Sequence, residues 1–141
     1  MSLYADTSFL VSLYVPDRHS PEAERRMASN PSVCVTPFHV AEWTHAVEQH
    51  VFRKSASRSE ADFAHEKFQQ HRDSGLWLQV AVPDSAFDLC VLLARRHGAK
   101  MGLRTLDTLH VASALELQAE GFWTFDERQR KLARTVGLKT T

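Results

Sequence analysis

Four acidic side chains stand at positions where an α/β protein places its functional groups. Asp6 and Asp126 each follow a short apolar run that predicts a strand, at residues 3–5 and 122–125. Ligands of open α/β sheets bind outside the carboxyl ends of the strands. Glu42 and Asp107 lie instead within predicted helices, beside apolar neighbours. These four carboxylates are the first candidates for chemistry in the chain.

Each acid also has a structural explanation when it is taken singly. Asp6 and Asp126 precede helical segments, where an aspartate N-cap stabilises a helix by ~1 kcal/mol. Asp107 in a first helical turn interacts favourably with the helix dipole. Glu42 has the weakest such explanation, because a carboxylate beside an apolar stripe is seldom left unpaired. When each acid is considered alone, the sequence does not decide between a structural and a functional role.

Taken together, the four acids predict a metal centre. Two carboxylates ~4 Å apart repel by about 4 kcal/mol at an effective dielectric constant of about 20, so a cluster is stable only when it is protonated or bound to a cation. A ligand set made of oxygen atoms suits Mg²⁺ or Mn²⁺ rather than zinc. Such ions polarise a phosphate and generate hydroxide near neutral pH. We therefore expect metal-dependent phosphodiester hydrolysis.

Alternating strands and helices are expected to position these acids. In the first half, the pattern predicts strands at residues 3–6 and 33–35, a turn at residues 7–8, and helices over about 9–15, 21–29 and 36–54. Thr36 and Pro37 are typical of a helix start, as an N-cap and a first-turn proline. A further amphipathic helix is expected from Ser59 to about residue 75, with Phe63 and Phe68 on its inner side.

The second half continues the alternation, with predicted strands at 76–82 and 122–125 and predicted helices over about 86–98, 106–121 and 127–137. Gly98 and Gly121 are expected to end their helices, since glycine favours the position that follows a helix. Parallel strands need helical crossovers, so this order predicts an α/β fold with a parallel sheet between helix layers. The chain has no internal repeat or Gly/Ser linker, and we expect a single domain over residues 1–141.

The composition is that of an ordinary globular protein. The 141 residues are 43% hydrophobic and 24% charged, which argues against collagen-like, disordered and disulfide-scaffold classes. Seventeen Lys and Arg balance seventeen Asp and Glu, which excludes a protein that coats nucleic acid by bulk positive charge but leaves local basic patches open.

Membrane insertion and secretion are not expected. The longest apolar run, Leu89 to Ala94, is far below the ~18 residues of a membrane span. Asp6 interrupts the apolar N-terminal run, which lacks the basic start of a secretory signal. Cys34 and Cys90 form no C-x-x-C pair, so two reduced thiols in the core and a cytoplasmic location are expected.

Four stretches resemble the signature blocks of PIN-domain ribonucleases, in particular the toxins of bacterial VapBC toxin-antitoxin pairs: YADTSFLVSLY, TPFHVAEWTHAV, RTLDTLHVASAL and WTFDERQRKLA. The similarity covers nearly the whole chain, and the ordered set is specific although each block alone is weak. By this resemblance Asp6, Glu42, Asp107 and Asp126 match the family's four acidic positions, which hold Mg²⁺ or Mn²⁺ and cleave RNA. It also implies a three-layer α/β/α fold with a central parallel sheet of about five strands.

The resemblance implies partners as well. The family's toxins act on RNA, form homodimers and are silenced by a small cognate antitoxin, which wraps the toxin with an extended segment that folds on binding. All four acids are present in this chain, so we expect an active enzyme.

Three further residues are candidates for substrate contacts. The resemblance places Thr7 after the first acid and Thr124 two residues before the last, where a hydroxyl would orient metal-bound water or a phosphate oxygen. The structural alternatives are a helix cap for Thr7 and a preference for strands at Thr124. Arg104 is the base closest in sequence to an acid and is the first candidate for a phosphate contact. For most of the other nearby bases a solvated helix face is the simpler explanation: Arg95, Arg96, Lys100, Arg128, Arg130, Lys131 and Arg134.

Histidine and tryptophan carry weaker signals. His110 lies three residues after Asp107 and His45 three residues after Glu42, but a buried, hydrogen-bonded histidine is a simpler explanation than a ligand. No His/Cys pair at zinc spacing occurs. The three tryptophans, at positions 43, 77 and 123, are expected in a core or an interface rather than stacked on bases.

Other functions stay open. A haloacid-dehalogenase phosphatase needs a second aspartate two residues after the first, and Ser8 stands there. A phosphoacceptor receiver domain needs an acidic pair near the end of the first strand and a late lysine after a strand, and neither is evident. The remaining alternative is a PIN-like RNA-processing nuclease, or a non-catalytic RNA- or protein-binding PIN domain, outside any toxin-antitoxin pair.

Overall fold

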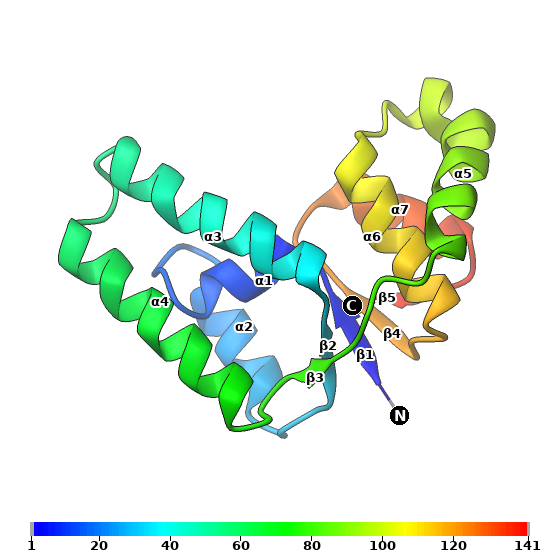
Figure 1. The fold of residues 1–141 in the computed structure, drawn as a ribbon. Helices are drawn as coiled ribbons and strands as arrows, with labels where there is room; N and C mark the ends of the chain where they lie inside the picture. Colours follow the sequence, from blue (N-terminus) through cyan, green and yellow to red (C-terminus); the bar gives the residue numbers. More distant parts are fainter. Residues whose placement is uncertain (1, 141) are drawn as a thin grey trace. The chain divides into compact units, whose positions relative to one another are not determined.

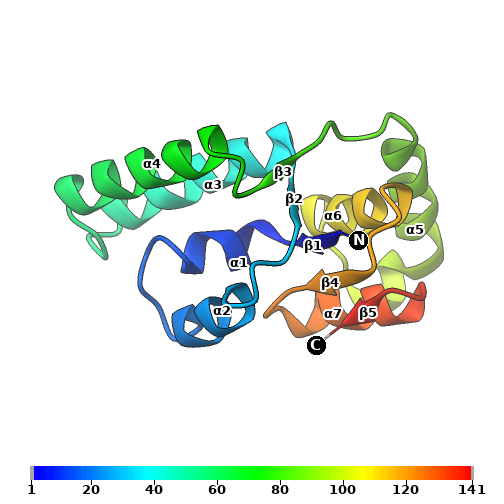
Figure 2. The same cartoon turned by 90° about the horizontal axis from the view of Figure 1, so that it is seen from below.

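The computed structural model describes residues 2–140, which form seven helices and a five-stranded parallel sheet (Figures 1 and 2). The strand order is β3-β2-β1-β4-β5. The predicted α/β class, a three-layer α/β/α fold with a central parallel sheet of five strands, is confirmed. Along the chain the elements are β1 (Leu3–Ala5), α1 (Thr7–Ser12), α2 (Ser20–Met27), β2 (Val33–Val35), α3 (Pro37–Phe52), α4 (Arg58–Asp73), β3 (Leu78–Gln79), α5 (Ser85–Met101), α6 (Thr105–Glu116), β4 (Gly121–Trp123), α7 (Glu127–Thr135) and β5 (Lys139–Thr140).

The chain divides into two compact units. The first unit comprises Met1–Asp6 and Ala81–Thr141, and the second comprises Thr7–Val80. The expectation of a single domain over residues 1–141 stays a prediction. None of the helices between residues 2 and 140 is long and apolar enough to cross a membrane.

In the first unit, β1, β4 and β5 pair in parallel. Leu3 lies opposite Gly121, Tyr4 opposite Phe122 and Ala5 opposite Trp123. A Cβ atom at Gly121 would lie 2.8 Å from Leu3 Cδ2, so a side chain at this position would require the Leu3 side chain to shift. The prediction that Gly121 ends a helix is therefore wrong, since it begins β4.

The C-terminus of α5 also differs from the prediction. The helix continues through Gly98 to Met101, and Gly102 follows it with a φ of +63°. A left-handed backbone angle of this kind favours glycine, so Gly102 is the C-cap and Gly98 is an interior residue.

The core of the first unit is organised around an aromatic stack. The rings of Tyr4 and Phe122 are stacked with their centres 5.7 Å apart, and both side chains are fully buried. His110 on α6 meets the edge of the Tyr4 ring. Helix α6 packs against α5, as both views show (Figures 1 and 2).

In the second unit, α3 and α4 lie side by side (Figures 1 and 2). Thr36 caps α3 as predicted, accepting a hydrogen bond from the His39 amide at 3.3 Å. Between the helices the rings of Trp43 and Phe68 are stacked at 4.2 Å, and Tyr14 meets both rings edge-on.

Three predictions for this unit are wrong in detail. Helix α4 begins after Ser57, which caps it, rather than at Ser59. Its inner face carries Ala61, Ala64 and Phe68, so Phe63 points outward and is 62% exposed. The strand expected over residues 76–82 is reduced to the two residues of β3, which lie at the edge of the sheet.

The two cysteines differ in their burial. Cys34 is buried in β2 as predicted, whereas Cys90 on α5 is only half-buried. Burial still raises the pKa of the Cys90 thiol above its ordinary value, which keeps the thiol protonated near neutral pH.

Candidate active site

Asp6 lies at the end of β1, where its side chain is almost fully buried. The pairing of β1 with β4 aligns Ala5 with Trp123, and the Asp6 amide donates to the Trp123 carbonyl at 3.0 Å. This register brings the Asp6 carboxylate to Thr124, whose hydroxyl donates to Asp6 Oδ2 at 2.8 Å. Functional groups thus meet at the carboxyl ends of two neighbouring strands.

Thr124 is the centre of a buried hydrogen-bond network. Its Oγ1 lies 2.8 Å from Asp6 Oδ2 and 2.8 Å from Gln129 Oε1, and it accepts from the Asp126 amide at 3.0 Å. A threonine hydroxyl has one proton, so it donates to one of these two oxygens at a time. Thr124 therefore does more than suit a strand by its shape.

Asp126 has two oxygen atoms with different partners. Oδ1 accepts from the Gln129 amide at 2.8 Å and so caps α7. Oδ2 lies 3.9 Å from Arg104 Nη2. The capping explanation is correct for one oxygen, and the other faces a cation.

Arg104 bridges two of the predicted acids. Its Nε donates to Asp107 Oδ2 at 2.9 Å, in addition to the longer contact with Asp126. The Arg104 side chain is 70% exposed, so this bridge is a surface ion pair that solvent screens. It nevertheless supplies positive charge between two carboxylates that would otherwise repel each other.

Gln129 belongs to the same network and was missed from the sequence. Its side chain is 1% exposed, and its Nε2 donates to the Asp107 carbonyl at 3.1 Å. The opposite amide orientation would set its oxygen against that carbonyl oxygen, so the contacts determine which atom is which. Leu132 and Ala133, at i+3 and i+4, are buried on the same side of α7. A glutamine on such an apolar stripe needs polar partners, and this was the available signal.

Glu42 and Thr7 form a separate pair in the second unit. The Thr7 hydroxyl donates to Glu42 Oε1 at 2.7 Å, and Glu42 itself is half-buried on α3. The carboxylate beside an apolar stripe is thus paired, as expected. Thr7 is the first residue of α1, and this bond uses its hydroxyl proton for Glu42.

The first unit therefore links Asp6, Asp107 and Asp126 into one hydrogen-bonded network, through Thr124 and Gln129. Among residues 2–140, no three carboxylate, imidazole or thiol groups are close enough together to form a preassembled metal site. The donors in the network are carboxylate and hydroxyl oxygen atoms, the set that Mg²⁺ and Mn²⁺ prefer. The Arg104 guanidinium contacts the Asp107 and Asp126 carboxylates, so it would compete with a cation bound there.

The histidines singled out in the sequence have structural partners. His110 is 2% exposed, and its Nδ1 lies 2.7 Å from the Tyr4 hydroxyl oxygen. His45 is exposed on α3, and its Nδ1 lies 2.9 Å from the Ala41 carbonyl oxygen. The buried, hydrogen-bonded histidine is the correct explanation for His110.

Trp43, Trp77 and Glu127 also have structural explanations. Trp43 and Trp77 are buried in the second unit, as expected of core residues. Glu127 is 80% exposed and forms an ion pair with Arg130.

Comparison with known proteins identifies the family. The family model of the PIN domain matches residues 3–135, so the chain belongs to the PIN domain family. The resemblance inferred from the four sequence blocks is confirmed.

Several solved structures share the fold. VapC20 of Mycobacterium tuberculosis, described as a sarcin-ricin loop cleaving toxin, aligns with a TM-score of 0.70 and 18% identity over 96% of this chain and 95% of that chain. VapBC2 of Rickettsia felis, bound to a DNA fragment from its promoter, aligns with a TM-score of 0.66 and 18% identity over 100% and 98%. A toxin-antitoxin complex from Klebsiella pneumoniae aligns with a TM-score of 0.59 and 14% identity over 89% and 87%. No curated protein sequence matches the chain. At these identities the likeness to solved structures shows the fold alone.

Proposed function

We propose that this chain is a Mg²⁺- or Mn²⁺-dependent endoribonuclease that hydrolyses phosphodiester bonds of RNA. The observation that carries the proposal is the network in which Thr124 and Gln129 tie together Asp6, Asp107 and Asp126. A purely structural set of helix caps would satisfy each acid from its own local amides. Here the buried Thr124 hydroxyl binds the Asp6 carboxylate and the Asp126 backbone amide, and the buried Gln129 side chain binds the Asp107 backbone carbonyl, so residues of three elements are held together.

Asp6, Asp107 and Asp126 are the proposed metal ligands in the first unit, and Glu42 stays the fourth acid predicted from the sequence. A bound divalent ion would polarise the scissile phosphate and supply hydroxide near neutral pH. The chain's own contribution is to hold the carboxylates in place before the ion binds, because preorganised groups need no rearrangement during the reaction.

Thr124 and Gln129 are the proposed positioning residues. Thr124 fixes Asp6 Oδ2 and the Asp126 amide, and Gln129 fixes the backbone of Asp107. Both side chains are almost completely buried, so their contacts are protected from water. Thr7 would orient Glu42 through its hydroxyl in the same manner.

Arg104 is the proposed phosphate contact at the site. Its guanidinium holds Asp107 and Asp126 through a mostly exposed side chain, which can turn toward an incoming phosphate. Arginine suits this role because its planar guanidinium forms paired hydrogen bonds with phosphate oxygen atoms.

We also propose that the chain is the toxin of a type II toxin-antitoxin pair, acting in the cytoplasm, forming a homodimer and silenced by a small cognate antitoxin. The support is the set of structural neighbours, among which VapC20 is described as a toxin and another is a toxin-antitoxin complex. RNA cleavage and the toxin role are separable, since a PIN nuclease outside any toxin-antitoxin pair would use the same carboxylates.

A cleavage assay tests the nuclease proposal. The purified chain is incubated with RNA in Mg²⁺, in Mn²⁺ and in excess chelator, beside Asp6→Asn and Asp107→Asn. We expect cleavage by the wild type only with a divalent ion, and loss of cleavage in both variants without unfolding. Asp88→Asn is the matched control, because Asp88 is an exposed aspartate on α5 in the same unit. Cleavage that persists in chelator would refute the metal requirement.

A growth assay tests the toxin role. Induced expression should arrest growth of a bacterial host, and the arrest should disappear in Asp6→Asn. Co-expression of a small reading frame adjacent to the gene should restore growth. Active cleavage in vitro without growth arrest would favour an RNA-processing nuclease.

A further inference from the structure

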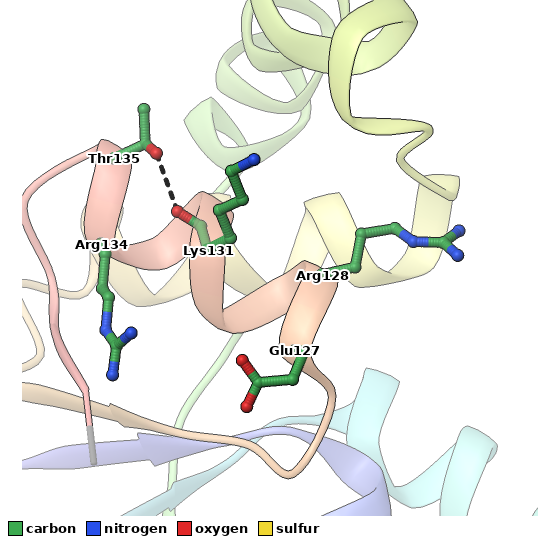
Figure 3. A pocket seen from close by; sticks show the side chains of 5 residues that line it. All are labelled: Glu127, Arg128, Lys131, Arg134 and Thr135. Atoms are coloured by element: carbon green, nitrogen blue, oxygen red, sulfur yellow. Dashed lines mark hydrogen bonds between the residues drawn. The ribbon is translucent and has the colours of Figure 1, made fainter.

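Helix α7 presents a basic face to solvent. Five of its residues line a hollow of about 500 Å³ on the surface: Glu127, Arg128, Lys131, Arg134 and Thr135 (Figure 3). At 3.6 residues per turn, these positions occupy about one third of the helix circumference. The opposite side of α7 is buried through Gln129, Leu132 and Ala133. The face is therefore the whole solvent side of this helix.

The charge on this face is concentrated and only partly offset. Residues 127–135 contain four basic side chains and one acidic side chain, whereas the whole chain is neutral. The acid, Glu127, pairs with Arg130, whose side chain is 15% exposed and also donates to the Thr124 carbonyl at 2.6 Å. This pair neutralises itself and leaves the other three cations unopposed.

The three remaining cations retain their positive charge. Arg128 Nη1 donates to the Gly102 carbonyl at 3.0 Å, and Arg134 Nε donates to Thr140 Oγ1 at 2.7 Å. Both partners are neutral, so they steady the guanidinium groups without cancelling their charge. Within residues 2–140 the Lys131 ammonium has neither a hydrogen bond nor an ion pair.

The arrangement suits an extended polyanion rather than a single phosphate. Figure 3 shows the head groups of Arg128, Lys131 and Arg134 pointing in different directions from one helix instead of converging. Their Cα positions span about 9 Å along the axis, at 1.5 Å per residue. A nucleic-acid strand carries a charge at comparable intervals, about one per 3.4 Å of axis in B-form DNA.

We propose that Arg128, Lys131 and Arg134 form a binding track for the phosphate backbone of the RNA substrate. This inference rests on the proposed nuclease function, because it extends the same site. Asp126 caps α7, so the track begins at a proposed metal ligand and leads away from it along the helix. Such contacts position a strand without reading its sequence.

The salt dependence of RNA binding tests the track. A fluorescently labelled RNA oligonucleotide is titrated with the full chain in chelator, over a series of salt concentrations, with anisotropy as the readout. The logarithm of affinity falls with the logarithm of salt by about 0.7 per neutralised phosphate of a single strand. We expect Arg128→Gln/Lys131→Gln/Arg134→Gln to reduce this slope by about 2, since three contacts are lost.

Two further variants keep the test decisive. Lys131→Gln alone removes no hydrogen bond or ion pair between described residues, so it should fold normally and reduce the slope by about 0.7. Arg95→Gln/Arg96→Gln/Lys100→Gln removes the same charge from exposed positions of α5 in the same unit and should leave the slope nearly unchanged. An equal loss in the α5 triple variant, or an unchanged slope in both α7 variants, would overturn the proposal. A polyglutamate peptide of equal charge that binds as tightly as the RNA would overturn it too.

The cleavage assay separates this inference from the function on which it rests. Metal-dependent cleavage together with an unchanged slope in the α7 variants would overturn the track and leave the nuclease standing. RNA binding that depends on α7, without cleavage under any metal condition, would support the track and refute the proposed nuclease.

Discussion

Replacing Thr124 with valine removes one hydroxyl group at nearly constant volume. The Asp126 amide loses its acceptor, and an unsatisfied donor of this kind costs about 1–3 kcal/mol. The Asp6 carboxylate loses a donor, and hydrogen bonds to charged groups contribute about 1.5–3 kcal/mol. Neighbouring contacts do not add fully, so we expect the free energy of unfolding to fall by about 3 kcal/mol.

Thermal denaturation and RNA cleavage measure the two consequences of Thr124→Val. For a chain of this size, about 3 kcal/mol corresponds to a fall in Tm of roughly 10 °C. A shift of Asp6 by about 1 Å is enough to reduce kcat about 100-fold. Thr44→Val is the matched control, because Thr44 is an exposed threonine whose hydroxyl donates only to the Val40 carbonyl. Equal Tm and equal cleavage in the two variants would refute the role assigned to Thr124.

Two other predictions concern charge. Arg104→Gln should raise the affinity for Mn²⁺ by at most about five-fold, since the surface ion pairs that compete with the metal contribute under ~1 kcal/mol; weaker Mn²⁺ binding in this variant would contradict it. Burial, and to a lesser degree the charge of Lys67, lowers the pKa of His71, which is hydrogen-bonded to the Tyr14 hydroxyl. The unfolded chain therefore takes up this proton more readily, so stability is lost as pH falls from about 6.5 through the folded pKa. Urea denaturation across this range should show a smaller loss for His71→Asn than for the wild type, and parallel curves would exclude a contribution from His71.

The acids at strand ends could be predicted because their signals are local. A short apolar run followed by Asp6 or Asp126 indicates both the strand and the edge at which it ends. The same holds for Thr36, whose type and position before Pro37 predict a helix start that the structure confirms.

The contacts between elements could not be predicted, because they depend on packing. Arg104 was singled out as the base closest to an acid, but its contact with Asp126 arises from how α6 and α7 pack. In the sequence, Gln129 is one polar residue of a charged helix, and its burial becomes evident only when the buried side of α7 is known.

Two errors in local structure have a physical origin. Gly98 and Gly102 are both suited to end α5, and the residues between them continue a helix, so composition alone does not choose between them. Phe63 was assigned to the inner face of α4, but one face holds only one stripe of residues, and Ala61, Ala64 and Phe68 occupy it. Neither error affects the acids, whose positions depend on other elements.

Direct titration with Mn²⁺, followed by electron paramagnetic resonance of the free ion, tests the central claim that these carboxylates bind a divalent cation. The wild type and Asp88→Asn should bind Mn²⁺ with the same affinity, and Mg²⁺ should displace it. Asp6→Asn and Asp107→Asn should each weaken Mn²⁺ binding at least about 10-fold. Removing a residue that only supports a metal ligand generally costs that much affinity, and removing a ligand should cost no less. Equal Mn²⁺ affinity in all four proteins would contradict the account.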